Sequence, residues 1–326
     1  MAGMEVGMIG LGRMGANFSL QALEKGIRVV GYSRGVNEND LVAKGLVLVP
    51  SIEDFRRELL PPRIILLYIP AGPAVDTILG QLIGVLDRGD IIADGGNSYW
   101  GDSIERGKRL KEHVISFVDL GTSGGMEGAR HGACFMAGGE KEAIERIRPL
   151  LTTLSVPGGF VHTGPIGTGH FTKLVHNGIE FGMLQAIAEG IDLLAHFHEK
   201  LDIPAVLSAW KNGSVIRSWL IELMERQLRE QGGMENIPPY VEDTGEVNWL
   251  ISDAIQMELP IPVIIMSVMR LFASRDKDGV WARAIAMMRH GFGGHAFGSD
   301  PLTANERRRG RVGCIYRTGQ EVKSEL

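Results

Sequence analysis

Four polar side chains interrupt an apolar stretch at residues 170–184 of the sequence. They are Lys173, His176, Asn177 and Glu180. In an α-helix, their offsets of three, four and seven residues fall within a sector roughly 100° wide and span ~10 Å of the helix axis. That length matches a small polyhydroxy molecule. An amine and a carboxyl group facing one ligand could exchange protons with it, so this stretch predicts acid–base chemistry.

The alternative to a reactive face is an ordinary solvated stripe on an amphipathic helix. The neighbouring residues argue against it, because apolar side chains occupy the opposite side and return to the polar sector one turn later: Leu174, Val175, Ile179, Phe181, Leu184 and Ile187. We therefore expect a helix that is buried on most sides. Burying an amine and a carboxylate costs several kcal/mol unless they are paired or used, which favours a functional site.

A glycine-rich loop lies near the start of the chain. Gly10, Gly12 and Gly15 form a G-x-G-x-x-G motif that follows a predicted strand and opens a predicted helix. In a βαβ unit, such glycines let the backbone approach a pyrophosphate at a helix N-terminus. This context predicts dinucleotide binding rather than a purely structural turn. The predicted cofactor contacts are Gly10, Leu11, Gly12, Arg13, Met14, Gly15, Ser33, Arg34, Pro70, Ala71 and Asn97.

The end of the second predicted strand bears on the choice of cofactor. An acidic residue there would hold the ribose 2′-hydroxyl of NAD, whereas this chain has Ser33 and Arg34. A guanidinium can stack on adenine or bind a 2′-phosphate through charge-assisted hydrogen bonds. The pair favours NADP, with NAD as the alternative.

Two further glycine-rich turns, Asp94–Ser98 and Gly121–Gly125, follow predicted strands. Each could be a tight turn that merely needs glycine. Both nevertheless lie at the carboxyl ends of strands, the edge at which open α/β sheets bind ligands. Asn97 and Ser123 supply neutral donors and acceptors there, so we expect them to hold hydroxyl and carboxylate groups beside a nicotinamide ring.

The pattern along the chain predicts an α/β fold, with a Rossmann-like doubly wound parallel sheet followed by an all-α domain. We expect a dinucleotide-binding domain at residues 1–167, a helical substrate and dimerisation domain at 168–298, and a solvated tail at 299–326 that contains Arg307–Arg311. The predicted strands are Val6–Ile9, Arg28–Tyr32, Ile64–Ile69, Ile91–Ala93, Val114–Val118 and Cys134–Ala137. The predicted helices of the first domain include Met14–Glu24, Ala74–Leu86 and Ser103–Lys111.

Composition excludes several classes of protein. With 326 residues and 44% hydrophobic content, the chain can bury a sizeable core. A net charge of −5 and the lack of aromatic residues within a basic run argue against a nucleic-acid partner. The apolar runs are too short to span a bilayer. Two cysteines are too few for a disulfide framework, which favours a cytoplasmic location. The sequence has no HExxH motif, so it does not indicate a catalytic metal.

Five motifs occur in a fixed order: GLGRMGAN, DGGNS, GTSGGMEGAR, KLVHNGIEFG and FGGHAF. Together they resemble those of decarboxylating 6-phosphogluconate dehydrogenases, over residues ~4 to ~298, and the length is similar to the short form of that family. The resemblance implies oxidation of 6-phosphogluconate at C3 by a nicotinamide cofactor. It also implies decarboxylation to ribulose 5-phosphate, without a metal, in the pentose phosphate pathway.

By motif, the resemblance makes Lys173 the general base and Glu180 the general acid. In the family, the tail of a second subunit completes the site with an Arg and a His, which correspond to Arg289 and His295 here. A homodimer or larger homo-oligomer is therefore implied, although His295 could equally be an ordinary loop histidine. The remaining implied substrate contacts are Asn97, Ser123, Gly124, Gly125, His176 and Asn177.

The sequence departs from the family in the region that contacts the substrate phosphate. Phe181 stands where a Tyr usually touches the phosphate, and it cannot donate a hydrogen bond. The stretch Asp243–Trp249 lacks a basic residue found in the long form. Leu271 replaces an expected arginine, with Arg270 and Arg275 as neighbours. The resemblance therefore leaves the phosphate contacts open.

Two rival functions stay open at this point. Another β-hydroxyacid dehydrogenase, of the 3-hydroxyisobutyrate type, would share the nucleotide loop and the lysine but typically lacks the HNGIE sequence. A non-catalytic NADP-binding module would have lost the acid–base groups, whereas Lys173 and Glu180 are both present. Because a proton donor is useful only if decarboxylation follows oxidation, Glu180 favours the sugar-acid reaction.

Overall fold

The computed structural model describes residues 3–34, 39–301 and 304. The chain falls into two compact units, one of residues 1–178 with 246–253 and one of residues 179–245 with 254–326. The expected solvated tail with its arginine-rich stretch, Arg307–Arg311, lies outside the described residues. Within the described part, no helix is both long and apolar enough to cross a membrane.

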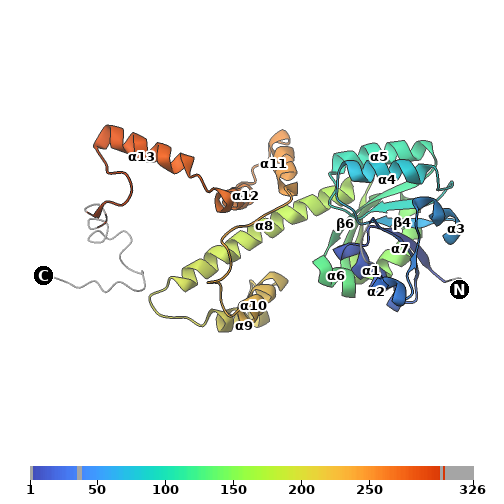
Figure 1. Cartoon of the computed structure of the whole chain (residues 1–326), viewed down its shortest axis with the longest axis horizontal. Helices are drawn as coiled ribbons and strands as arrows, with labels where there is room; N and C mark the ends of the chain where they lie inside the picture. The colour runs from blue at the N-terminus through green and yellow to red at the C-terminus, as the bar shows by residue number, and fades with distance from the viewer. Residues whose placement is uncertain (1–2, 35–38, 302–303, 305–326) are drawn as a thin grey trace. The chain divides into compact units, whose positions relative to one another are not determined.

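A mostly parallel sheet forms the centre of the first unit (Figure 1). In the described residues it has eight strands in the order β3-β2-β1-β4-β5-β6-β7-β8. Neighbouring strands run parallel except β6 and β7, which are antiparallel. The strands are β1 Glu5–Ile9, β2 Arg28–Tyr32, β3 Val47–Leu48, β4 Ile64–Leu67, β5 Ile91–Asp94, β6 Ser116–Ser123, β7 Ala133–Gly139 and β8 Ser155–Gly164.

Helices cover both faces of this sheet (Figure 1). On one face, Phe18 of α1 and Ile144 of α7 belong to a buried cluster with strand residues. On the other face, Leu79 of α4 and Leu110 of α5 do the same. Strands covered on both faces read as continuous apolar runs, which explains why most of them could be predicted. The helices of this unit are α1 Arg13–Glu24, α2 Asn39–Ala43, α3 Phe55–Glu58, α4 Pro73–Ile83, α5 Trp100–Glu112, α6 Gly125–His131 and α7 Lys141–Leu154.

Parts of the sheet differ from the prediction. The predicted doubly wound parallel sheet is present, but β7 returns antiparallel to β6. Only residues 124–132 join these two strands, and a parallel crossover needs a dozen residues or more. The prediction also missed β3, which is two residues long, and β8. The start of β8 contains Pro157 and two glycines, which read as a turn but are tolerated in a strand at the edge of a sheet.

The second unit consists of helices, as the periodicity after residue 170 predicted. Two of them begin at side-chain caps: Asp202 accepts a hydrogen bond from the backbone N–H of Ala205, and Ser218 accepts one from that of Ile221. The helices that lie wholly in this unit, among the described residues, are α9 Ile203–Gly213, α10 Trp219–Gln231, α12 Pro262–Arg275 and α13 Val280–Gly293. Two more, α8 Thr168–Ala195 and α11 Glu246–Gln256, have residues in both units.

The helix α8 confirms the predicted helix that carries the polar stripe, but only part of its predicted burial. Lys173 and Leu174 are buried. Further along, Ile179 is 54% exposed and Leu184 is 43% exposed, so the expectation of a helix buried on most sides is wrong for this half. A helix of 28 residues is about 42 Å long, which exceeds the ~30 Å diameter of a small domain. One sheet therefore cannot cover all of it.

Candidate active site

The glycine-rich loop has the geometry that a pyrophosphate requires. Gly10 has φ +93°, and a side chain there would collide with the backbone of Tyr68. A side chain at Gly15 would collide with the carbonyl oxygen of Gly10, so helix and strand meet at bare backbone. Gly12 caps α1, and a Cβ there would meet no atom within 4 Å. The helix N-terminus is thus open at the position where a phosphate would approach.

Four of the other predicted cofactor contacts follow β2 and β4, the two strands that pair with β1. Ser33 and Arg34 follow β2, and Arg34 is exposed. Pro70 and Ala71 follow β4 and precede α4. In the loop itself Leu11 is buried among core residues, whereas Arg13, at the start of α1, is exposed. The predicted Met14 is half-buried against the first core.

Lys173 is the centre of the predicted acid–base group. Its side chain is only 8% exposed, in the second turn of α8. The amine Nζ lies 3.4 Å from Nδ1 of His176, and Nε2 of the same imidazole lies 3.0 Å from Oγ of Ser123. An amine, an imidazole and a hydroxyl therefore form a series of contacts. The first two groups come from α8 and the third from the end of β6. The structure brings these three predicted residues together.

A glycine of β6 lets α8 approach the sheet beside the lysine. A Cβ on Gly121 would lie 2.7 Å from Cβ of Lys173 and 2.7 Å from the carbonyl oxygen of Gly169. No real Cβ tolerates such contacts, so a larger residue would push the helix away. In the turn Gly121–Gly125, which we predicted to contact a ligand, the first glycine therefore serves helix packing.

The turn after β5 is held by a buried carboxylate. Asp94 accepts hydrogen bonds from the backbone N–H of Gly96 at 3.1 Å and from Oγ of Ser98 at 2.7 Å. Between them Asn97 is exposed, and its Nδ2 donates to Oε1 of Glu246 at 3.4 Å. The predicted Asn97 therefore sits on a rigid turn with its amide directed outward.

The start of α6 offers backbone to a ligand. Gly124 has φ +117° and Gly125 φ +58°, conformations that favour glycine. A Cβ on Gly125 would meet no atom within 4 Å, and this residue is exposed. On α8, Asn177 is half-buried next to His176. Their roles as substrate contacts stay predictions.

Sequence reasoning missed residues that hold the site in place. Asp119, at 0% exposure, accepts hydrogen bonds from the backbone N–H groups of Gly167 and His170 at 2.8 Å each. Burial raises the pKa of this carboxyl group, and the two N–H donors oppose the rise. A usable signal was present: both Asp94 and Asp119 end an apolar run, IIAD and FVD, where a polar residue is buried at the ligand edge.

The remaining predicted residues belong to the second unit. Glu180 is half-buried on α8, seven residues beyond Lys173. Arg289 is exposed near the end of α13. His295 follows that helix, and its carbonyl oxygen lies 2.8 Å from Nδ1 of His290. Their roles stay predictions.

The region that departs from the family includes an arginine that already has partners. Arg275, at the end of α12, pairs with Asp243 at 2.7 Å and with Glu242 at 2.8 Å. These ion pairs raise the pKa of Arg275 and hold the guanidinium within the unit. Leu271 is half-buried and Arg270 is exposed on the same helix. Of the two neighbouring arginines, Arg275 is thus held by carboxylates, whereas Arg270 is exposed.

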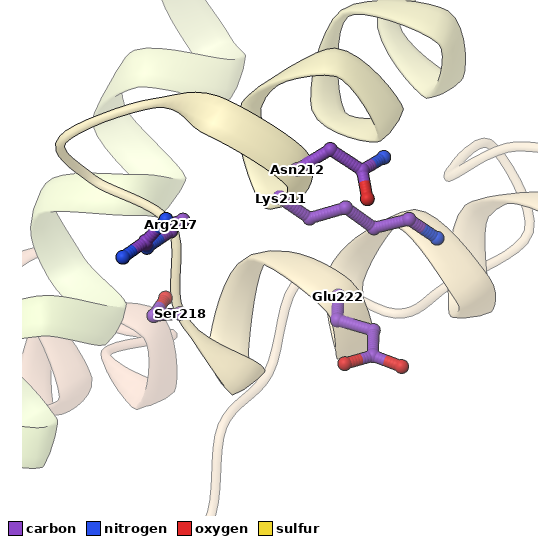
Figure 2. A pocket seen from close by; sticks show the side chains of 5 residues that line it. All are labelled: Lys211, Asn212, Arg217, Ser218 and Glu222. Carbon is purple, nitrogen blue, oxygen red and sulfur yellow. The ribbon is translucent and has the colours of Figure 1, made fainter.

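One cavity of the second unit has about 320 Å³ and lies between α9 and α10 (Figure 2). None of the predicted site residues lines it; its walls are Lys211, Asn212, Arg217, Ser218 and Glu222. The cationic ends of Lys211 and Arg217 point to opposite sides in Figure 2. Lys211 also pairs with Glu225 at 2.9 Å. This cavity therefore does not offer two converging cations to an anion.

The fold and the first unit's site together define a nicotinamide-dependent dehydrogenase. The glycine loop accommodates a pyrophosphate, and the buried amine with its imidazole and hydroxyl partners lies at the ligand edge of the sheet. In the part of the chain that the structure describes, no group of three His, Cys, Asp or Glu could hold a metal ion.

Comparison with known proteins gives the family. The sequence model described as the NAD binding domain of 6-phosphogluconate dehydrogenase matches residues 5–164, and that of the 6-phosphogluconate dehydrogenase C-terminal domain matches residues 169–297. The Bacillus subtilis protein YqeC, named provisionally as a 6-phosphogluconate dehydrogenase, is 41% identical over 296 residues, which are 90% of this chain and 99% of that protein. The chain belongs to the 6-phosphogluconate dehydrogenase family.

Two further relatives differ in cofactor. A decarboxylating 6-phosphogluconate dehydrogenase of Haloferax volcanii, NAD(+)-dependent by name, is 37% identical over 90% of this chain and 98% of that protein. The Plasmodium falciparum 6-phosphogluconate dehydrogenase, whose structure is described with NADP+ and with 6-phosphogluconate, has a TM-score of 0.76 at 30% identity. That alignment covers 91% of this chain and 66% of the Plasmodium chain. Near-complete coverage of the first two relatives agrees with the predicted short form.

Proposed function

We propose that the protein oxidises 6-phosphogluconate and decarboxylates it to ribulose 5-phosphate, with NADP as the preferred oxidant. The observation that carries the proposal is the contact series from the buried amine of Lys173 through His176 to Ser123. It is supported by membership of the family and by the open helix N-terminus at Gly12. Within this proposal the chain works in the cytoplasm, since two cysteines suit a reducing compartment.

The cofactor would be held at the carboxyl edge of the sheet. Gly12 and Arg13 would face the pyrophosphate at the N-terminus of α1. Arg34, exposed after β2, would meet the 2′-phosphate of NADP, a contact that NAD does not offer. When bound, the nicotinamide ring supplies the hydride acceptor for C3 of the substrate.

Lys173 acts as the base in the first step. The neutral amine takes the proton of the C3 hydroxyl as C3 becomes a carbonyl. The resulting ammonium then polarises that carbonyl, so the electrons of the C1–C2 bond can move to oxygen as carbon dioxide leaves. In the proposed mechanism the lysine returns its proton to the oxygen, which yields an enediol.

Glu180 completes the reaction as the acid. Its carboxyl group protonates C1 of the enediol, which is the former C2 of the substrate. The lysine takes up the proton of the hydroxyl that becomes the ketone, and the product is ribulose 5-phosphate. Substitution of Glu180 by Ala should therefore slow the last step more than the oxidation. Substrate hydroxyls and the carboxylate would be bound by Asn97, Ser123, Gly124, Gly125, His176 and Asn177.

The proposal includes an oligomer whose partner subunit completes the site with Arg289 and His295. Both residues follow from the motif alone, and Arg289 is exposed on α13. The many exposed apolar side chains of this helix support a covering partner. The proposed domain division stays at residues 1–167 and 168–298.

The decisive experiment incubates the purified protein with 6-phosphogluconate and either NADP or NAD, and follows reduced cofactor and carbon dioxide together. We expect equal amounts of both products and faster turnover with NADP. Reduced cofactor without carbon dioxide would indicate the 3-hydroxyisobutyrate type of enzyme. Cofactor binding without turnover would indicate the non-catalytic module. Gluconate, as a matched substrate without phosphate, measures how much the phosphate contributes.

A further inference from the structure

A buried histidine joins the segments that carry the site residues of the first unit. His170, 2% exposed, lies one turn before the lysine in α8. Its ring atom Nε2 lies 3.0 Å from the carbonyl oxygen of Asp94, and its Nδ1 lies 2.7 Å from Oγ of Ser103 on α5. A carbonyl oxygen only accepts, so Nε2 carries the hydrogen of this bond.

The backbone of the same residue makes a second connection. The N–H of His170 donates to Oδ2 of Asp119 at 2.8 Å. Asp94 and Asp119 occupy paired positions at neighbouring strands, β5 and β6, and both are fully buried. Asp94 leads into the turn of Asn97. His170 therefore contacts the end of β5, which leads into the turn of Asn97, and the middle of β6, the strand that ends at Ser123.

We propose that His170 is a positioning residue that sets the place of the Lys173 amine relative to the turn of Asn97. The inference rests on the proposed function. The carboxylate of Asp119 accepts from the first turn of α8 and fixes the helix along its axis. The ring bond to the Asp94 carbonyl lies to the side of the axis and fixes the rotation of the helix.

Rotation matters because the offset from residue 170 to residue 173 places both side chains on the same face of α8. A rotation of about 10° moves an atom ~6 Å from the helix axis by about 1 Å. A displacement of about 1 Å at a reacting group can cost on the order of 10²-fold in rate. A lost ring bond is thus sufficient to misplace the amine while the helix stays formed.

The test compares two substitutions at this position in the full chain. His170→Leu keeps the bulk and removes the donor, whereas His170→Gln keeps an N–H that can reach the carbonyl. We expect kcat/KM for 6-phosphogluconate to fall on the order of 10²-fold in the Leu variant, mainly through kcat. The Gln variant should recover most of this loss. Binding of NADP, measured by fluorescence titration, should stay within about twofold in both variants.

A matched control uses another histidine that bonds to backbone carbonyls. Nε2 of His162, on β8, lies 3.0 Å from the carbonyl of Gly139 and 2.9 Å from that of Gly164. His162→Leu should leave kcat/KM within about threefold. The proposal is overturned if His170→Leu does the same. It is also overturned if the Gln variant is as slow as the Leu variant while both lose thermal stability equally.

Hydrogen exchange provides a readout that does not depend on the substrate. The amides of residues 95–98 and 171–176 should exchange faster in His170→Leu than in the wild type, and should be restored in His170→Gln. Absence of turnover by the wild type with 6-phosphogluconate would refute the proposed function alone. Exchange rates unchanged in the Leu variant would refute the positioning role, whatever the substrate.

Discussion

The two units bury their apolar side chains to very different extents. In the first unit Phe18, Phe135 and Leu79 are fully buried, and both sheet faces have continuous clusters. In the second unit a smaller cluster of Ile191, Leu207, Ile221 and Leu228 joins α8, α9 and α10. In α13, by contrast, none of the residues is buried, with Trp281 67% and Phe292 78% exposed.

The first unit therefore has a complete hydrophobic core, whereas the second unit exposes apolar side chains on its surface. The first unit satisfies its buried charges internally: Arg63, for example, pairs with the fully buried Asp90 at 2.9 Å. Monomeric soluble proteins rarely expose large apolar patches, so the exposed apolar side chains of the second unit are consistent with the proposed oligomer. Catalytic groups of the first unit should therefore be removable without unfolding, whereas changes on α13 should alter assembly.

The largest expected effect comes from the amine in the scaffold. Lys173→Met should lower kcat for 6-phosphogluconate by about 10³-fold or more, because it removes the amine proposed to take the C3 proton. Thermal unfolding should change little, since the methionine chain replaces the buried aliphatic stem. Lys108→Met, at an exposed lysine of α5, is the control. Normal turnover by the Lys173 variant would eliminate the proposed base.

A change on the exposed surface should act through assembly. The double substitution Trp281→Ser and Phe292→Ser should weaken self-association by about tenfold or more, a cost of at least about 1.4 kcal/mol. Activity should fall at low protein concentration and recover as the concentration rises. Light scattering after size-exclusion chromatography measures the state. Arg283→Ser, also exposed on α13, is the control, and a wild type that is monomeric at all concentrations would contradict the comparison.

Two glycines of the nucleotide loop separate cofactor binding from folding. Gly12→Ala should leave the unfolding free energy nearly unchanged, because the added methyl group points into open space. It should weaken NADP binding by about tenfold, since it blocks the approach of the pyrophosphate. Gly15→Ala should instead lose about 1–3 kcal/mol of stability through its collision with Gly10. Equal effects of both changes on stability would be inconsistent with this division.

A smaller effect is expected at the ribose. Arg34→Ala should raise the KM for NADP by several-fold to about tenfold and leave that for NAD almost unchanged, because only NADP carries the 2′-phosphate. Steady-state kinetics with both cofactors provides its own control. If the two KM values rise together, the residue does not discriminate between the cofactors.

The smallest effect concerns the pH dependence of the scaffold. Burial raises the folded-state pKa of Asp119, so the folded chain binds this proton more tightly than the unfolded chain does. The contribution of Asp119 to the unfolding free energy therefore decreases as the pH rises from the pKa of this group in the unfolded chain to its raised pKa in the folded chain. Above the raised pKa the contribution is constant. The Asp119→Asn variant lacks this pH-dependent contribution. Urea unfolding of both proteins at a series of pH values should show their difference decreasing with pH; an increasing difference would refute the assignment.

Local signals predicted well what depends on local structure. The run at β1, the glycine loop and α1 were predictable because strand, turn and helix follow one another within Glu5–Glu24. The direction of β7 and the pairing of β8 were not, because pairing is decided between distant segments. Lys173, His176 and Ser123 were predicted as site residues, and the structure brings them together. The supporting role of His170 was missed, since only tertiary contacts reveal it.

The burial of α8 shows a different limit. Its periodicity correctly predicts apolar faces, but such a pattern does not say which molecule covers them. Ile179 and Leu184 are apolar yet exposed in the single chain. The sequence therefore predicts that a face of the helix is apolar, but it does not identify the segment or molecule that packs against that face.

At Gly121 and Lys173, the strand β6 and the helix α8 pack with no space for one more carbon atom. Since a Cβ added at residue 121 would lie 2.7 Å from Cβ of the lysine, the backbone of β6 limits how closely the root of this side chain can approach the sheet. Alanine at this position would shift the root of the lysine without removing any polar group. Residue 121 is thus a position at which one methyl group would test whether the place of this lysine matters, apart from its charge.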